Sequence, residues 1–491
     1  MVTGLFDHIT VSGVMAFIYF MDFVISLFII FFDKKTPTAT LAWIMLLNLL
    51  PIVGLVLYLV FSQHISRLKV SKMSENETMM KHFVLDIQKE QIRHGFVHYS
   101  NEITNRWKNM ILLNLQYADS LLLGSRSIDL ICDGKEMFEK LIRDIENAKS
   151  SVNVCYFIVK DDFVGRKLID TLTAKAKEGV EVRLLMDAMG SKQITRHKLK
   201  DFKAAGGKYA FYFEPRIRHM FLRFNYRNHR KIVTIDDTVG YIGGFNIARE
   251  YLGFKRKFGY WRDEHLRIEG NLVFDLVSRF LIDWRYAYDD TTDLSELITI
   301  DNPESDYENA IPGQIVSSGP DELKEQIKRA FMKMISCAEK SIYIQTPYLV
   351  PDLSVIDSLE MAAQSGVDVR IMIPCMPDHP FVYHTTLYNA SILMEAGARV
   401  YIYENGFLHA KTMVVDGEVS TVGSANFDIR SFKLNFETNA FIYDKDFARK
   451  MEEQFEKDIL KSREYTFAER ESRGVYNKMM ERISRLLSEI L

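Results

Sequence analysis

Two histidines of the chain, about 180 residues apart, head the same pattern of residues. In each copy the histidine is followed by a lysine, an aspartate, a turn containing small residues and an asparagine. The members are His229, Lys231, Asp236, Gly244 and Asn246 in the first copy, and His409, Lys411, Asp416, Ser424 and Asn426 in the second. A single His-x-Lys pair is common, whereas two complete copies in matching positions indicate that both contribute to chemistry.

These residue types suit the transfer of a phosphodiester group. The segments 231–235 and 411–415 have the β-branched pattern of strands, in which residues two apart project to the same face. Each motif lysine should therefore lie beside its histidine. Lysine and asparagine can stabilise charge on phosphate oxygens, and the small residues Gly244 and Ser424 let the backbone approach such a ligand. We predict that the histidines and lysines are catalytic and that the glycine, the serine and the asparagines bind substrate.

Imidazole can act both as nucleophile and as proton carrier, because its unperturbed pKa is about 6.5. If the two histidines lie on opposite sides of one phosphorus, one attacks it and forms a covalent phosphohistidine. The other protonates the leaving alcohol and then deprotonates the incoming one. Asp263 and Glu437, downstream of the two motifs, are the candidates for orienting the histidines. Asp236 and Asp416 complete the predicted catalytic set, although their position where a strand meets a turn indicates a structural role.

Other segments also occur twice, which indicates two similar units. In residues 179–184 and again in 366–371, a glycine marks the end of a helix and the start of a strand. In both strands the charged residues alternate with apolar ones and should lie on one exposed face. Strands that alternate with helices predict an α/β fold on a mixed or mostly parallel sheet. We therefore predict an internal duplication with two α/β units, residues 119–295 and 310–491, packed as a pseudo-two-fold pair.

The N-terminal part differs in kind. Residues 1–62 contain two apolar stretches, 14–32 and 39–61, each long enough for a helix to cross roughly 30 Å of hydrocarbon. We predict a transmembrane hairpin, with the larger basic count after the second stretch placing the two units in the cytosol. Residues 63–118 are predicted to form a juxtamembrane linker or a packing layer, and the tail from residue 467 onward an amphipathic helix.

The composition is that of a globular protein, with 47% hydrophobic and 26% charged residues. The net charge of −3 gives no overall positive field, so we predict no nucleic-acid partner. The four cysteines are widely spaced and form no metal or disulfide pattern, as expected for reduced thiols in the cytosol. A basic stretch, residues 216–230, is either a solvated loop or a second site for an anionic head group.

The two motifs resemble those of the phospholipase D superfamily, and the wider pattern resembles that of bacterial-type cardiolipin synthases. The resemblance covers nearly the whole chain and includes residues 41–43, 50–54, 226–233, 261–263, 346–352, 406–411 and 423–432. It implies an inner-membrane enzyme that transfers a phosphatidyl group between two phosphatidylglycerols, releasing glycerol through a phosphohistidine, with no cofactor or catalytic metal. It favours His229 as nucleophile and His409 as acid and base, while the pseudo-symmetry leaves the reverse assignment open.

The motifs alone are compatible with other functions. A membrane-bound phospholipase D that hydrolyses phospholipids or exchanges their head groups would carry the same residues, and so would a phosphatidylserine synthase of this superfamily. The alternative from another class is a lipid-binding membrane scaffold without turnover. The membrane hairpin favours a lipid acceptor, because both substrates then arrive by lateral diffusion.

Overall fold

The computed structural model describes most of the chain. The described residues are 11–32, 37–61, 75–95, 102–214, 225–288, 309–322 and 324–487. Most of the basic stretch before the first motif (215–224), the expected connection between the units (289–308) and the last four residues lie outside them.

Each half of the body repeats one order of strands and helices. The first half contains β1 (Leu123–Ile131), α7 (Gly134–Glu146), β2 (Ser151–Tyr156), α8 (Phe163–Lys177), β3 (Glu181–Asp187), α9 (Lys200–Ala204), β4 (Lys208–Tyr212), β5 (Arg227–Asn228), β6 (Ile232–Ile235), β7 (Val239–Gly243), β8 (Trp261–Arg262), β9 (His265–Gly270) and α10 (Leu272–Tyr288). The second half contains β10 (Ile311–Ser318), α12 (Gln326–Cys337), β11 (Ser341–Gln345), β12 (Leu349–Val350), α13 (Leu353–Gln364), β13 (Asp368–Pro374), α14 (Pro380–Glu395), β14 (Arg399–Tyr403), β15 (Phe407–Leu408), β16 (Thr412–Val415), β17 (Val419–Gly423), β18 (Phe427–Asp428), α15 (Ile429–Lys433), β19 (Asn435–Tyr443), α16 (Lys445–Ile459), β20 (Ser462–Glu464), α17 (Phe467–Ser472) and α18 (Val475–Leu487).

The two halves share one mixed sheet whose order mirrors itself about its middle. The order is β20-β14-β13-β11-β16-β17-β19-β10-β1-β9-β7-β6-β2-β3-β4. At the centre β1 and β10 pair antiparallel, with Leu123 opposite Gly313. The strands β2, β3 and β4 are parallel, as are β11, β13 and β14, and these two groups lie on opposite sides of the centre. This is the arrangement of a duplicated α/β unit, as the sequence predicts.

Helices cover the sheet and bury it in a core that continues from one half to the other. Leu141 of α7 and Leu168 of α8 pack on strands of the first half. A second core contains both Leu276 of α10 and Met451 of α16, which belong to different halves. Because apolar side chains of both halves share this core, the halves are held together by the hydrophobic effect over a wide area.

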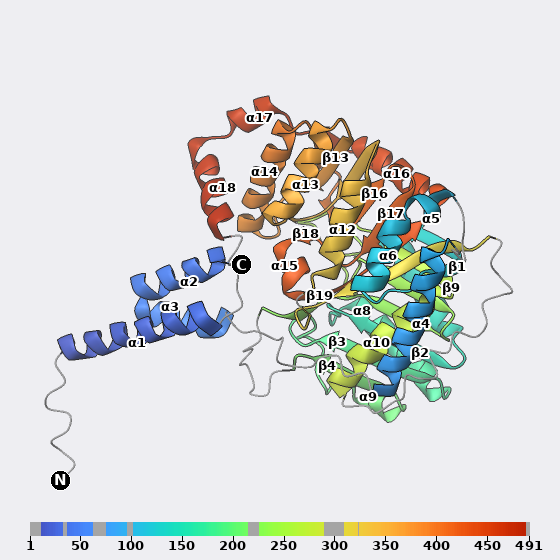
Figure 1. The fold of residues 1–491 in the computed structure, drawn as a ribbon. Helices are drawn as coiled ribbons and strands as arrows, with labels where there is room; N and C mark the ends of the chain where they lie inside the picture. Colours follow the sequence, from blue (N-terminus) through green and yellow to red (C-terminus); the bar gives the residue numbers. More distant parts are fainter. Residues whose placement is uncertain are drawn as a thin grey trace, which may run out of the picture.

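The region expected as a linker or packing layer packs against the body in its described part. It contains α4 (Glu75–Arg93), α5 (Glu102–Arg106) and α6 (Lys108–Tyr117), and Figure 1 shows α4 and α6 lying against the body. Leu85 and Met110 are fully buried in the core of the second half. The buried carboxylate of Glu77 pairs with Arg285 of α10 at 2.6 Å, which fastens α4 to the first half.

Three apolar helices at the N-terminus project from this body (Figure 1): α1 (Val11–Phe32), α2 (Pro37–Leu49) and α3 (Pro51–Phe61). The sequence predicts one continuous span over 39–61, but the structure breaks it before Pro51, whose missing N–H and ring disfavour an unbroken helix. Within the described ranges, no helix combines the length and the apolar character needed to cross a membrane.

Candidate active site

Short strands cross between the halves directly before each motif histidine. β5 of the first half pairs in parallel with the start of β19, and the His229 N–H donates to Phe436 O at 2.9 Å. β15 of the second half pairs in the same way with β8, and the His409 N–H donates to Arg262 O at 2.7 Å. Each histidine is therefore held against the strand of the other half that leads into a predicted orienting carboxylate.

The orienting carboxylates are exchanged between the halves. His229 Nδ1 lies 3.0 Å from both carboxylate oxygens of Glu437 and 3.2 Å from Ser424 O. His409 Nδ1 lies 2.6 Å from Asp263 Oδ2. Because each carboxylate contacts Nδ1, Nε2 is the ring nitrogen left for chemistry. The sequence identified both carboxylates, and the structure adds that each one serves the histidine of the other unit.

The motif lysines bring the two copies into one site. Lys231 Nζ donates to His229 O at 2.6 Å, and Lys411 Nζ donates to His409 O at 2.5 Å. Both lysine side chains are buried, and the charge of each acts on both histidines. The two motif lysines therefore lie close enough to both histidines to concentrate positive charge locally, although the chain as a whole is slightly acidic.

Burial lowers the proton affinity of these basic groups. It lowers the pKa of His229 against the opposing effect of Glu437, and together with the charge of Lys411 it lowers the pKa of His409 to about 4. Burial also lowers the pKa of Lys231 to about 7. In the free site both imidazoles are therefore neutral at pH 7. An anionic phosphate would raise all of these pKa values, because it favours the charged forms.

The two small motif residues lie behind the carboxylates. A Cβ at Gly244 would be 2.0 Å from Asp263 Oδ1, so only glycine leaves room for that carboxylate. Ser424 Oγ donates to Glu437 Oε2 at 2.5 Å. The sequence assigns both residues to substrate binding, whereas in the structure each one positions a carboxylate that in turn orients a histidine.

The motif asparagines make different contacts from those expected. Asn246 uses both side-chain atoms internally, since Oδ1 accepts from Ile158 N–H at 3.1 Å and Nδ2 donates to Tyr251 OH at 2.7 Å. Asn426 Nδ2 lies 3.3 Å from Asp428 Oδ2. Each amide nitrogen carries a second N–H, so these contacts still leave a donor for a phosphate oxygen, while the lysines supply the positive charge.

Asp236 and Asp416 lie at the far ends of β6 and β16, roughly 16 Å from the motif lysines at about 3.3 Å per residue. The Asp236 carboxylate accepts backbone N–H groups of residues 149–151 at 2.7–3.1 Å. Asp416 does the same for residues 339–341 at 2.7–3.2 Å and pairs with Arg106 at 2.5 Å. Their inclusion in the catalytic set is therefore corrected, because both carboxylates are taken up in joining each motif hairpin to the neighbouring strand.

Aromatic side chains that sequence reasoning did not identify line the histidines. The Phe157 ring lies 5.0 Å from that of His229, while the rings of Trp261 and Tyr251 lie 5.1 Å and 6.1 Å from that of His409. They exclude water from the site, which strengthens its electrostatic interactions. The position of Trp261, two residues before Asp263, was the only signal for them in the sequence.

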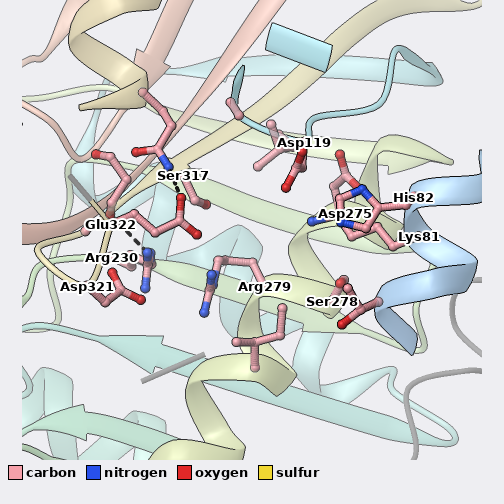
Figure 2. Close-up of a pocket in the computed structure, with 17 residues that line it drawn as sticks. Lys81, His82, Asp119, Arg230, Asp275, Ser278, Arg279, Ser317, Asp321 and Glu322 are labelled. Atoms are coloured by element: carbon pink, nitrogen blue, oxygen red, sulfur yellow. Dashed lines mark hydrogen bonds between the residues drawn. The ribbon is translucent and has the colours of Figure 1, made fainter. Parts of the chain in front are cut away.

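Arg230, the residue after His229, connects the site to the rest of the first half through hydrogen bonds. Arg230 is 2% exposed and donates to both oxygens of Asp283 at 2.8 and 2.7 Å, to Glu437 O at 3.2 Å and to Ser318 O at 3.1 Å. Its side chain lines a cavity of about 160 Å³ between α4, α10 and β10. Figure 2 shows Arg230 in the wall of this cavity. This arginine joins the strand that carries Glu437 to α10.

The described residues contain no group of three or more His, Cys, Asp or Glu side chains arranged to hold a metal ion. The four cysteines are free thiols.

Comparison with known proteins gives consistent matches. The family described as "Cardiolipin synthase, PLD-like domain" matches residues 141–258 and 331–459, and "Phospholipase_D-nuclease N-terminal" matches residues 22–63. The chain is 42% identical over 490 residues to the major cardiolipin synthase ClsA of Bacillus subtilis, covering 98% of this chain and 100% of the relative. It is 42% identical over 483 residues to a cardiolipin synthase of Listeria monocytogenes serotype 4a, again covering 98% and 100%.

A solved structure shows the same fold. The phosphatidylserine synthase of Haemophilus influenzae matches with a TM-score of 0.60 at 16% identity, over 80% of this chain and 100% of that one. At this low identity the likeness concerns the fold alone.

Proposed function

The chain belongs to the family of cardiolipin synthases with phospholipase D-like domains, and from this premise we propose that it joins two phosphatidylglycerols into cardiolipin and glycerol. It is thus a phosphatidyltransferase. The observation that carries the proposal is the single site to which each half gives one histidine and one lysine, with each histidine oriented by a carboxylate of the other half.

In the first step His229 Nε2 attacks the phosphorus of the donor phosphatidylglycerol. A phosphorus–nitrogen bond forms, the bond to the glycerol oxygen breaks, and His409 gives that oxygen a proton. The positive charge that develops on the His229 ring is stabilised by Glu437, 3.0 Å from Nδ1. Asp263 favours the protonated form of His409 in the same way, and the bound phosphate anion adds to this effect.

In the second step the same groups act in reverse. His409, now neutral, takes the proton of a hydroxyl group on the second phosphatidylglycerol. The hydroxyl oxygen attacks the phosphorus, the bond to His229 breaks, and cardiolipin is formed. Lys231 and Lys411 stabilise the phosphate oxygens in both transition states, which is the largest electrostatic contribution that this site can make.

The N-terminal helices support attachment to a lipid bilayer. α1 exposes large apolar side chains, including Phe17, Phe20 and Phe31, at 64%, 62% and 74%. A stripe of this kind in water is unfavourable, whereas lipid would cover it. We propose a bacterial cell-membrane location with both catalytic halves in the cytosol, where four free cysteines are expected.

The test uses the full chain in vesicles of pure phosphatidylglycerol, with products identified by mass spectrometry. Cardiolipin and free glycerol are expected in equal amounts, and His229→Ala and His409→Ala should each abolish both. Phosphatidic acid in place of cardiolipin would overturn the proposal in favour of hydrolysis. A wild type that forms neither product would instead indicate a scaffold without turnover.

A further inference from the structure

Beside His409 lies a group of polar side chains that the two steps above do not use. Asp378 precedes α14, and Tyr348 lies between β11 and β12. The Tyr348 hydroxyl hydrogen-bonds to Asp378. The parallel pairing of β12 with β18 sets Tyr348 next to Asn426 of the second motif.

Asp378 lies near two side chains that surround the reacting histidine. The charge of Asp378 acts on Lys411 and on Tyr251, and the Tyr251 ring lies 6.1 Å from that of His409. The Asp378 side chain is 23% exposed. It is therefore within reach of a molecule that enters the site from solvent or from the membrane surface.

The group offers acceptor atoms without matching donors. Asn426 is 5% exposed, and its Oδ1 has no hydrogen-bond partner among the described residues. A buried acceptor of this kind is costly unless a donor reaches it. Asp378 accepts from Tyr348 and from the His379 N–H, while an ionised carboxylate can accept about four hydrogen bonds. A ligand with several O–H groups would satisfy these atoms.

The first half has a different surface at the equivalent place. Ile158 stands beside Asn246 as Tyr348 stands beside Asn426, and its N–H satisfies Asn246 Oδ1. The neighbouring Phe157 covers His229. The two motif asparagines therefore differ, because Asn246 Oδ1 has a backbone donor whereas Asn426 Oδ1 has no partner among the described residues.

We propose that Asp378, Tyr348 and Asn426 form a hydroxyl-binding subsite beside His409, which holds the free glycerol hydroxyls first of the leaving group and then of the acceptor lipid. The inference rests on the proposed function, because that function supplies an acceptor with a glycerol head group. The subsite places the alcohol next to the proton-carrying histidine and leaves His229 for attack on phosphorus. A head group that ends in a carboxylate would be repelled by Asp378.

The test measures how one phosphohistidine intermediate divides among competing acceptors. Full-length protein in phosphatidylglycerol vesicles receives equal concentrations of propane-1,2-diol and propan-1-ol, which differ by one hydroxyl. Mass spectrometry counts the phosphatidyl-diol, the phosphatidyl-propanol and the cardiolipin. Because all three products come from one intermediate, their ratios report only the second step.

The wild type should prefer the diol over propanol. Asp378→Ala should lower both the diol-to-propanol ratio and the cardiolipin-to-propanol ratio about tenfold or more, because it removes a hydrogen bond to a charged group. Tyr348→Phe should lower both ratios by a smaller factor. Asp446→Ala, on the exposed face of α16, is the matched control and should keep the wild-type ratios.

Unchanged ratios in both Asp378→Ala and Tyr348→Phe, or a fall of all products in equal proportion, would overturn the subsite. Failure of the proposed function looks different: the wild type would then form no cardiolipin, while its preference between the two alcohols could still be measured.

Discussion

Replacing Glu437 by glutamine should slow the enzyme without disturbing its fold. The carboxylate lies 3.0 Å from His229 Nδ1 and accepts hydrogen bonds from Ser424 Oγ at 2.5 Å and Asn435 Nδ2 at 3.2 Å. A glutamine can keep its oxygen on His229 and turn its NH2 toward Ser424 Oγ, which can also accept. The substitution therefore removes the negative charge while leaving the shape of the site nearly unchanged.

The size of the effect follows from the charge that forms on His229 during attack. A hydrogen bond to a charged group contributes about 1.5–3 kcal/mol, and each 1.36 kcal/mol is a factor of ten, so kcat/KM should fall roughly 10- to 150-fold. The pH profile should move as well. Burial lowers the pKa of His229 and Glu437 opposes this, so the glutamine variant should have a still lower pKa and an acid limb at lower pH.

The assay is the initial rate of glycerol release from phosphatidylglycerol vesicles between about pH 5 and 9, with thermal unfolding as the control for folding. Glu404→Gln, at a half-exposed position, is the matched control and should behave like the wild type. The reasoning is refuted if Glu437→Gln keeps kcat/KM within about twofold of the wild type, or if its acid limb moves to higher pH.

Three further predictions test the support of the site. Gly244→Ala places a Cβ 2.0 Å from Asp263 Oδ1, so kcat should fall roughly 100-fold, as for a misplacement of about 1 Å; an unchanged kcat contradicts this. Arg262 contacts the buried carboxylate of Asp458 at 2.7 Å, and Arg262→Met removes this cation. The free energy of unfolding in urea should therefore fall by about 3–5 kcal/mol. A loss below about 1 kcal/mol contradicts this prediction. Lys231 has a pKa of about 7 in the free enzyme, and a bound phosphate raises this pKa. The alkaline limb of the pH profile of kcat should therefore lie at higher pH than that of kcat/KM. Coinciding limbs contradict this prediction.

Patterns of period two and repeated motifs predicted much of this architecture from the sequence. The strands β6 and β16 after the histidines follow from the local pattern of residues. The duplication and the two candidate orienting carboxylates follow from corresponding positions of the repeat. The exchange of Asp263 and Glu437 between halves does not, because it depends on β5 and β15. A strand of two residues, such as Arg227–Asn228, is too short to carry a hydrophobic pattern, and its partner lies some 200 residues away.

The roles of polar motif residues were also beyond local reasoning. The residue type gives Asn246 two donors and an acceptor, but only the folded chain shows that Ile158 satisfies the acceptor and that Tyr251 accepts from one of the donors. Asp378 and Tyr348 stand in loops with no periodicity, so nothing in their own segments links them to His409. Such residues are recognised only when the halves are brought together.

The exchange of carboxylates has a consequence for the whole molecule, because neither half holds a complete catalytic group. Residues 119–295 supply His229 but depend on the other half for Glu437, and the reverse holds for His409 and Asp263. The two halves have also diverged in a matched way. Gly244 leaves the space that the Asp263 carboxylate fills, and Ser424 supplies the hydroxyl that donates to Glu437. Since each replacement makes sense only with its own carboxylate, the two histidines are supported differently, as expected if one attacks phosphorus and the other carries protons.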